Sequence, residues 1–223
     1  FFNASLWGWN YGFGYAQSGE RLHASHQMIH QQNALVPRSV STETGDAFQS
    51  FSSGDLVHEF MIRYNKETGT DFFQNYLQAI QTNIRSDGKT GGQHSLIVWE
   101  DENVLVFVPK APICEWELQL MPKIPVGNIL EADRSMRESL DRGMLTALKA
   151  LDIMGARMVT SIEFSKRFDI IEPGQHLLYS FIPRLPYAPD TFSEAQLRFI
   201  CGAYPEDVAL VCRNTIAQFD SKG

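Results

Sequence analysis

The sequence predicts an α+β fold in which one long helix crosses a largely antiparallel sheet. Short apolar stretches with period-two alternation recur along the chain, as in strands. Residues 131–154 instead carry apolar side chains at helical spacing. From residue 70 onward the order reads helix, three strands, long helix, two strands and two helices. Strands that come in runs favour antiparallel pairing over a parallel α/β sheet.

The first strand is predicted from aromatic residues that alternate with other side chains: Trp7, Trp9, Tyr11, Phe13 and Tyr15. Residues 38–55, rich in Ser, Thr and Gly, read as a linker or mobile loop. A helix over 70–84 follows, with Thr70 or Asp71 as its cap. The segment 86–92, SDGKTGG, is predicted to be a turn.

The remaining strands are predicted at 94–99, 104–108, 115–122, 157–164 and 176–183. In the strand over 115–122, apolar residues alternate with Glu117 and Gln119, so we expect a half-buried strand with Glu117 facing water. The long helix is expected to stop at Gly155. Two further helices are predicted, one opening at Ser193 and one over 205–219.

The amino-acid composition limits which classes of function are possible. The 223 residues are 43% hydrophobic, enough for one or two domains, and the net charge is −7. No run of Lys or Arg supports nucleic-acid binding or an anionic membrane patch. The longest apolar run, 104–108, is too short to span a bilayer, and no signal peptide is visible. Three widely spaced cysteines without a C-x-x-C pair favour a reducing, cytoplasmic location over a structural zinc site of the usual kind.

The segment 15–37, YAQSGERLHASHQMIHQQNALVP, carries the candidate chemistry. His30 is the candidate nucleophile, because a neutral imidazole with an ordinary pKa of about 6.5 can attack phosphorus. Gln32, two residues later on the same strand face, would donate its amide to a phosphate oxygen. Ser25 and Gln17 could hold the leaving phosphate, and Gly19 could let the backbone approach it. The plainer alternatives are a packed or surface histidine, a solvated glutamine, a capping serine and a turn glycine.

This pattern resembles the signature of the galactose-1-phosphate uridylyltransferase-like branch of the histidine-triad (HIT) superfamily, F-E-N-x-G-x-x-x-G-(A/C)-S-x-x-H-P-H-G-Q. Gly19, Ser25, His30 and Gln32 match it, Tyr15 stands at the aromatic position and Gln17 at the Asn position. Two residues depart from it: Met28 replaces the first His of H-x-H and His23 replaces the second Gly. A later segment also resembles the family, with matches at Val108, Pro109, Glu117, Leu120, Pro122 and Lys123.

The resemblance implies a HIT-like fold of two halves. Residues 1–45 would end the first half, whose opening strands would be missing, and 46–223 would form the second. It implies a nucleotidyltransferase or phosphorylase that acts on nucleoside diphosphate sugars or dinucleoside polyphosphates through a His30-nucleotidyl intermediate. Lys123 would contact a phosphate or carboxylate; the alternative is a surface lysine at a strand end. The expected partners are a small nucleotide substrate and, by analogy, a second copy of the chain in a homodimer.

Three alternatives stay open. Met28 cannot hydrogen-bond strongly, which favours a nucleotide-binding paralogue without catalysis. A hydrolase would let water resolve the intermediate, although Gln32 is typical of the transferase branch. No organic cofactor is required, but a divalent metal such as zinc is an alternative. If this segment were helical, much of the set Glu20, His23, His26 and His30 would face one side and could bind it. The family's other metal site is not expected, because Leu178 and Ser180 stand where it has histidines.

Overall fold

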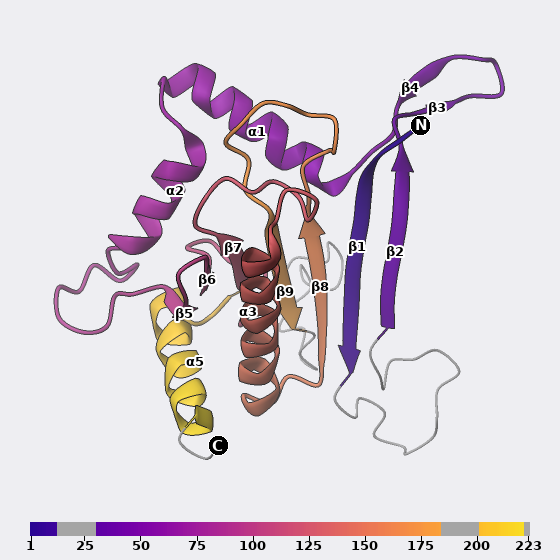
Figure 1. Ribbon diagram of the computed structural model, residues 1–223. Helices are drawn as coiled ribbons and strands as arrows, with labels where there is room; N and C mark the ends of the chain where they lie inside the picture. Colours follow the sequence, from indigo (N-terminus) through magenta and orange to yellow (C-terminus); the bar gives the residue numbers. More distant parts are fainter. Residues whose placement is uncertain (13–29, 184–200, 221–223) are drawn as a thin grey trace.

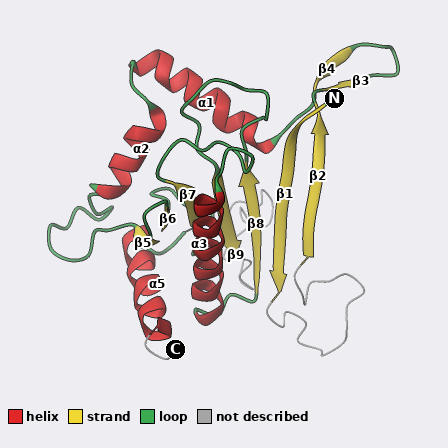
Figure 2. Cartoon of the chain, viewed as in Figure 1, coloured by secondary structure: helices red, strands yellow, loops and turns green. Residues whose placement is uncertain are grey.

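The structure is a computed structural model that describes residues 1–12, 30–183 and 201–220, with backbone alone at His30, Phe219 and Asp220. A seven-stranded antiparallel sheet forms its centre, in the order β2-β1-β8-β9-β7-β6-β5 (Figures 1 and 2). Its strands are β1 (Phe2–Gly12), β2 (His30–Pro37), β5 (Ile97–Glu100), β6 (Val104–Phe107), β7 (Leu118–Pro122), β8 (Met158–Phe164) and β9 (Leu178–Pro183). Each of the predicted strands within the described ranges is therefore found, with ends shifted by one to three residues at most positions.

Helices cover both faces of the sheet. On one face lie α3 (Arg134–Ile153) and α5 (Pro205–Asp220), and their apolar residues pack with Val104, Val106, Leu118 and Leu120. On the other face lie α1 (Ser53–Thr68) and α2 (Phe72–Gln81), which pack with Leu105, Phe107 and Met121. We refer to these as the α3 face and the α1 face. The α+β architecture with a long helix packed across an antiparallel sheet confirms the predicted fold class.

The helix ends follow the expected chemistry. Asp71 accepts a hydrogen bond from the Gln74 amide at 2.8 Å, and Asp133 accepts one from the Met136 amide at the same distance. Gly155 lies just beyond α3 with a φ of 101°, a left-handed conformation that glycine adopts without strain. Asp71, one of the two residues predicted to cap α2, is thus its cap, and the predicted stop of the long helix at Gly155 is confirmed.

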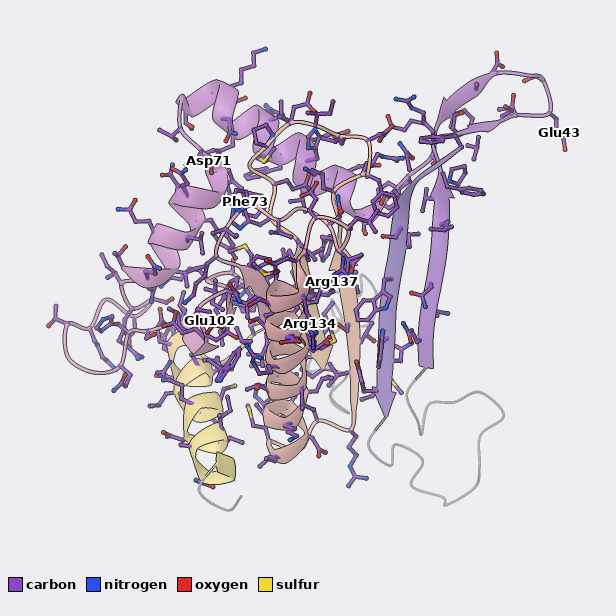
Figure 3. The ribbon with its side chains drawn as sticks, viewed as in Figure 1. Glu43, Asp71, Phe73, Glu102, Arg134 and Arg137 are labelled. Atoms are coloured by element: carbon purple, nitrogen blue, oxygen red, sulfur yellow. The ribbon has the colours of Figure 1, made fainter. Side chains whose placement is uncertain are left out.

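The prediction of a linker at 38–55 is wrong. Here the chain forms a hairpin of β3 (Ser39–Ser41) and β4 (Ala47–Gln49), and α1 already begins at Ser53. The hairpin projects from the end of the main sheet, with Glu43 at its tip (Figure 3). Its composition resembles that of a linker because every residue of both strands is exposed, so no apolar alternation reveals them.

The expectation that Glu117 faces water is also wrong, since this residue is only 2% exposed. The sheet is covered on both faces at β7, so alternation there does not mark a solvent side. Glu117 accepts hydrogen bonds from the Ile113 amide at 2.7 Å and from Gln119 at 3.0 Å. Burial raises the pKa of this carboxyl above its ordinary value.

The main sheet runs without a break across the predicted boundary at residue 45, because β1 pairs with both β2 and β8. The division into two HIT-like halves stays a prediction. The helix predicted to open at Ser193 begins outside the described residues. Among the residues that are described, no helix is both long and apolar enough to cross a membrane.

Candidate active site

The floor of the candidate site is formed by β2, β1 and β8 on the α1 face. Residues directly opposite each other in antiparallel strands share a face. Gln32 lies opposite Gly8, His30 opposite Asn10, and Asn10 in turn opposite Thr160. The register therefore places the His30 position in one polar row with Asn10 and Thr160, beside the row that contains Gln32.

A cavity of about 650 Å³ lies over this floor, a size that suits a small-molecule ligand. Its lining includes Asn10, Gln32 and Thr160 from the sheet and Ser53 from the first turn of α1. Ser53 is held in place because its hydroxyl donates to the Glu163 carbonyl oxygen at 2.9 Å. The start of α1 therefore forms one wall of the cavity, and the strands form its floor.

Asn10 and Thr160 are joined by a hydrogen bond, in which the Thr160 hydroxyl donates to the Asn10 side-chain oxygen at 2.8 Å. This contact fixes the Asn10 carboxamide, whose two N–H groups can then serve an anionic ligand. Gly8 lies between Gln32 and Ile162 in the next row. A Cβ at Gly8 would lie 2.8 Å from the Ser161 carbonyl oxygen, so glycine is required at this close approach.

The predicted site residues are only partly within the described structure. Gln17, Gly19 and Ser25 lie outside it, as do Met28 and the histidines at 23 and 26. Gln32 is exposed and lines the cavity, and His30 is the first residue of β2. Their spacing on one strand is as predicted.

Lys123 is not brought to this cavity. It follows β7, which is separated from β2 by three strands of the sheet. Its ammonium group donates to the Asp101 carbonyl oxygen at 2.6 Å and pairs with Glu100 at 2.5 Å. The structure therefore assigns Lys123 a contact with a carboxylate of its own chain, at a distance from Gln32.

The described ranges contain no group of three or more His, Cys, Asp or Glu residues arranged to hold a metal ion. The alternative zinc ligands Glu20, His23 and His26 lie outside those ranges. On β9, Ser180 donates to Glu117 at 3.3 Å and accepts from Gln119 at 3.4 Å.

Sequence reasoning did not identify Asn10 and Thr160. The signal for Asn10 was present, because the alternation that puts Trp9 and Tyr11 on one face puts Asn10 on the other. Thr160 could not be found in this way, because its pairing with Asn10 joins residues 150 positions apart.

No family model matches the chain, and no curated protein does. Several solved structures do match the chain. A uridylyltransferase mutant aligns over 98% of this chain and 64% of its own, at 13% identity and a TM-score of 0.66. An ADP-glucose phosphorylase from Arabidopsis thaliana, solved with bound ADP-glucose, aligns over 95% of this chain and 59% of its own, at 18% identity and a TM-score of 0.63.

A galactose-1-phosphate uridylyltransferase-like protein, also from Arabidopsis thaliana, aligns over 95% of this chain and 61% of its own, at 17% identity and a TM-score of 0.62. The chain spans about three fifths of the length of these structures. It has the fold of this group, so the resemblance seen in the sequence is confirmed at the level of the fold.

Proposed function

We propose that the protein transfers a nucleotidyl group between phosphorylated substrates through a covalent His30 intermediate. The observation that carries the proposal is the register of β2, β1 and β8. The His30 position lies opposite Asn10 in this register, and both Asn10 and Gln32 line a cavity of about 650 Å³, which supports the proposal. The fold shared with a uridylyltransferase and an ADP-glucose phosphorylase supports the same class of reaction.

The reaction has two displacements at one phosphorus atom. An imidazole nitrogen of His30 attacks the α-phosphorus of a nucleoside diphosphate sugar or dinucleoside polyphosphate. A P–N bond forms, and the P–O bond to the departing phosphate breaks. An oxygen of an acceptor phosphate then attacks the same phosphorus, and the P–N bond breaks to release the imidazole. The acceptor is a sugar phosphate or inorganic phosphate.

Gln32 and Asn10 stabilise the charge that develops on the non-bridging oxygens. Carboxamide N–H groups donate hydrogen bonds without losing a proton, so they serve both displacements equally. Thr160 acts through Asn10 as a positioning residue, because its hydroxyl holds the Asn10 oxygen. Gln17, Gly19 and Ser25 would complete the phosphate contacts from the segment that precedes β2.

The test is the intact mass of the protein after incubation with UDP-, ADP- and GDP-sugars and dinucleoside polyphosphates. We expect a nucleoside monophosphate adduct that is labile in acid, stable in base and absent in His30→Ala. His94→Ala is the matched control, because His94 is an exposed histidine that does not line this cavity. An adduct that persists in His30→Ala would contradict the proposal.

A second candidate is a nucleotide-binding protein without catalysis, which Met28 favours because it stands where the family has a histidine. This protein would bind nucleotides in the same cavity. Measurable nucleotide binding that Gln32→Ala weakens, with no adduct from any donor, would select this function over transfer.

A further inference from the structure

A second cavity lies on the α3 face, behind the strands that floor the candidate active site. Its volume is about 440 Å³, within the usual range for small-molecule sites. Trp7, Trp9 and Asn33 contribute from β1 and β2, and Arg137 and Asp141 from α3. Since Trp9 and Asn10 are adjacent on one strand, their side chains point to opposite faces of the sheet. The side chains that characterise the two cavities therefore lie on opposite faces of the sheet, although Trp7, Trp9, Asn33 and Glu163 border both.

The strand wall of this cavity is a row of aromatic rings. Trp7 and Trp9 are 5.3 Å apart between ring centroids, and Trp7 meets Tyr179 edge to face at 5.5 Å. Both indoles are half-buried, so part of each ring remains accessible. An accessible indole offers an apolar surface of the kind that packs against C–H groups of a ligand.

The opposite wall and the rim carry polar groups of both charges. Arg137 and Asp141 lie one helical turn apart on α3, and Asn33 is exposed on β2. Arg137 donates to the Ile129 carbonyl oxygen at 3.1 Å, which holds its guanidinium at the rim (labelled in Figure 3). These three side chains are planar and each can make two parallel hydrogen bonds.

The lining also includes the buried carboxyl of Glu163, which is 6% exposed. Its carboxyl oxygens accept from the Tyr179 hydroxyl at 2.8 Å and from the Ser5 hydroxyl at 3.4 Å. Burial raises the pKa of this carboxyl. Because its oxygens are already hydrogen-bonded and an arginine lies at the rim, the cavity does not select a cation.

We propose that this cavity binds a neutral pyranose ring, on the face of the sheet opposite the nucleotide cavity. A pyranose presents a face of C–H groups, which packs on Trp7 and Trp9, and a rim of hydroxyls that both donate and accept. Asp141, Asn33 and Arg137 meet those hydroxyls with a matching mixture of acceptors and donors. The proposed pyranose site does not involve His30, so it does not depend on whether the protein transfers nucleotides.

Saturation-transfer NMR tests the site with the methyl glycosides of glucose, galactose, mannose and N-acetylglucosamine as probes. We expect transfer to the ring C–H protons of at least one glycoside, unchanged by saturating UDP or ADP. Trp7→Leu should weaken binding roughly tenfold, because it removes the stacking surface. Thermal unfolding followed by circular dichroism checks that this variant is folded.

Asp141→Asn should not disturb the fold, since Asp141 is exposed on α3. A loss of binding in this variant therefore reports on the site and not on folding. Asp141→Asn should weaken binding severalfold, whereas Asp152→Asn, another exposed position on the same helix, should leave it unchanged. The site would be overturned by no transfer to any glycoside, or by transfer that Trp7→Leu and Asp141→Asn both leave intact. A Trp7-dependent signal from tetramethylammonium instead of the glycosides would show a cation site and equally overturn the proposal.

Discussion

At the scale of single residues, the candidate active site depends on which side of a strand each residue faces. Asn10 and Trp9 are adjacent in sequence, but their side chains point to opposite faces of the sheet, because side chains alternate along a strand. Trp9 therefore lines the cavity on the α3 face, where Asn10 does not, although Trp9 also borders the cavity that contains Asn10. The same rule separates Thr160 from Ser161 on β8. This gives each site residue an immediate neighbour that can serve as a control.

Thr160→Val should slow formation of the nucleotidyl adduct about tenfold. Valine keeps the shape of threonine but removes the hydroxyl that holds the Asn10 carboxamide. Asn10→Leu removes the donors themselves and should cost about 100-fold, the usual effect of losing one donor to a developing oxyanion. Rapid-quench mass measurement of the adduct gives both rates.

Ser161→Ala is the control for Thr160→Val. Ser161 is fully buried on the α3 face, and its hydroxyl has no hydrogen-bond partner among the described residues. Removing it should leave the adduct rate unchanged. If Ser161→Ala slowed the adduct as much as Thr160→Val, the role given to Thr160 would be a general effect of perturbing β8.

At the scale of elements, the cavity wall depends on how closely α1 approaches β8. Gly54, in the first turn of α1, packs on the backbone of Ser165, so that a Cβ would lie 1.8 Å from the Ser165 carbonyl oxygen. The Ser53 hydroxyl bonds the Glu163 carbonyl oxygen at the same junction. The helix therefore begins in direct contact with the strand backbone, and this contact places Ser53 beside the cavity.

Gly54→Ala should lower the free energy of unfolding by about 3 kcal/mol, because the added methyl group cannot fit without displacing α1. Gly91→Ala is the control, since a Cβ there meets nothing within 4 Å and its backbone needs no left-handed conformation. Urea unfolding measures both. A Gly54→Ala protein as stable as the Gly91→Ala protein would show that α1 does not pack as described.

At the scale of the whole molecule, the buried carboxyls make opposite contributions to the dependence of the free energy of unfolding on pH. Glu206 is fully buried, and its carboxylate accepts from Lys110 at 2.6 Å and from Asn83 at 2.9 Å. Burial acts to raise its pKa, but these hydrogen bonds outweigh burial and lower the pKa to about 2. Within the part of the chain that the structure describes, no cationic side chain pairs with Glu117 or Glu163, and burial raises the pKa of each.

The sign of each effect follows from proton linkage. Glu206 stabilises the fold above its unfolded pKa, and this stability is lost as pH falls from about 4.5 toward 2. Glu117 and Glu163 have the opposite effect. The folded state favours their neutral forms, so their contribution to stability is lost as pH rises above the pKa that each carboxyl has in the unfolded chain. We expect Glu206→Gln to cost roughly 2 kcal/mol at pH 7 and to flatten the acid limb of the stability curve.

Urea unfolding over a series of pH values measures both limbs. Glu163→Gln should flatten the neutral limb and leave the acid limb as it is. An acid limb of unchanged slope in Glu206→Gln would contradict the role given to the Lys110 contact.

The sequence predicts most of the main sheet and the long helix because their apolar patterns are regular. It misses the β3–β4 hairpin, because the residues of these strands are exposed and show no apolar alternation. It also misses α1, because the apolar residues of this helix do not follow a regular helical period. It predicts Gln32 beside His30, since both lie on one strand. It cannot predict Thr160, or the distance of Lys123 from the cavity, because these depend on the order of strands in the sheet.

The paired indoles of β1 also give the protein a natural optical reporter. Trp7 and Trp9 lie 5.3 Å apart with their planes inclined at 52°, close enough for their electronic transitions to couple. Coupled chromophores at an oblique angle produce a circular dichroism couplet, two bands of opposite sign that neither indole gives alone. The amplitude of that couplet depends on the geometry of β1, the strand shared by both cavities, so their occupancy can be followed without any label.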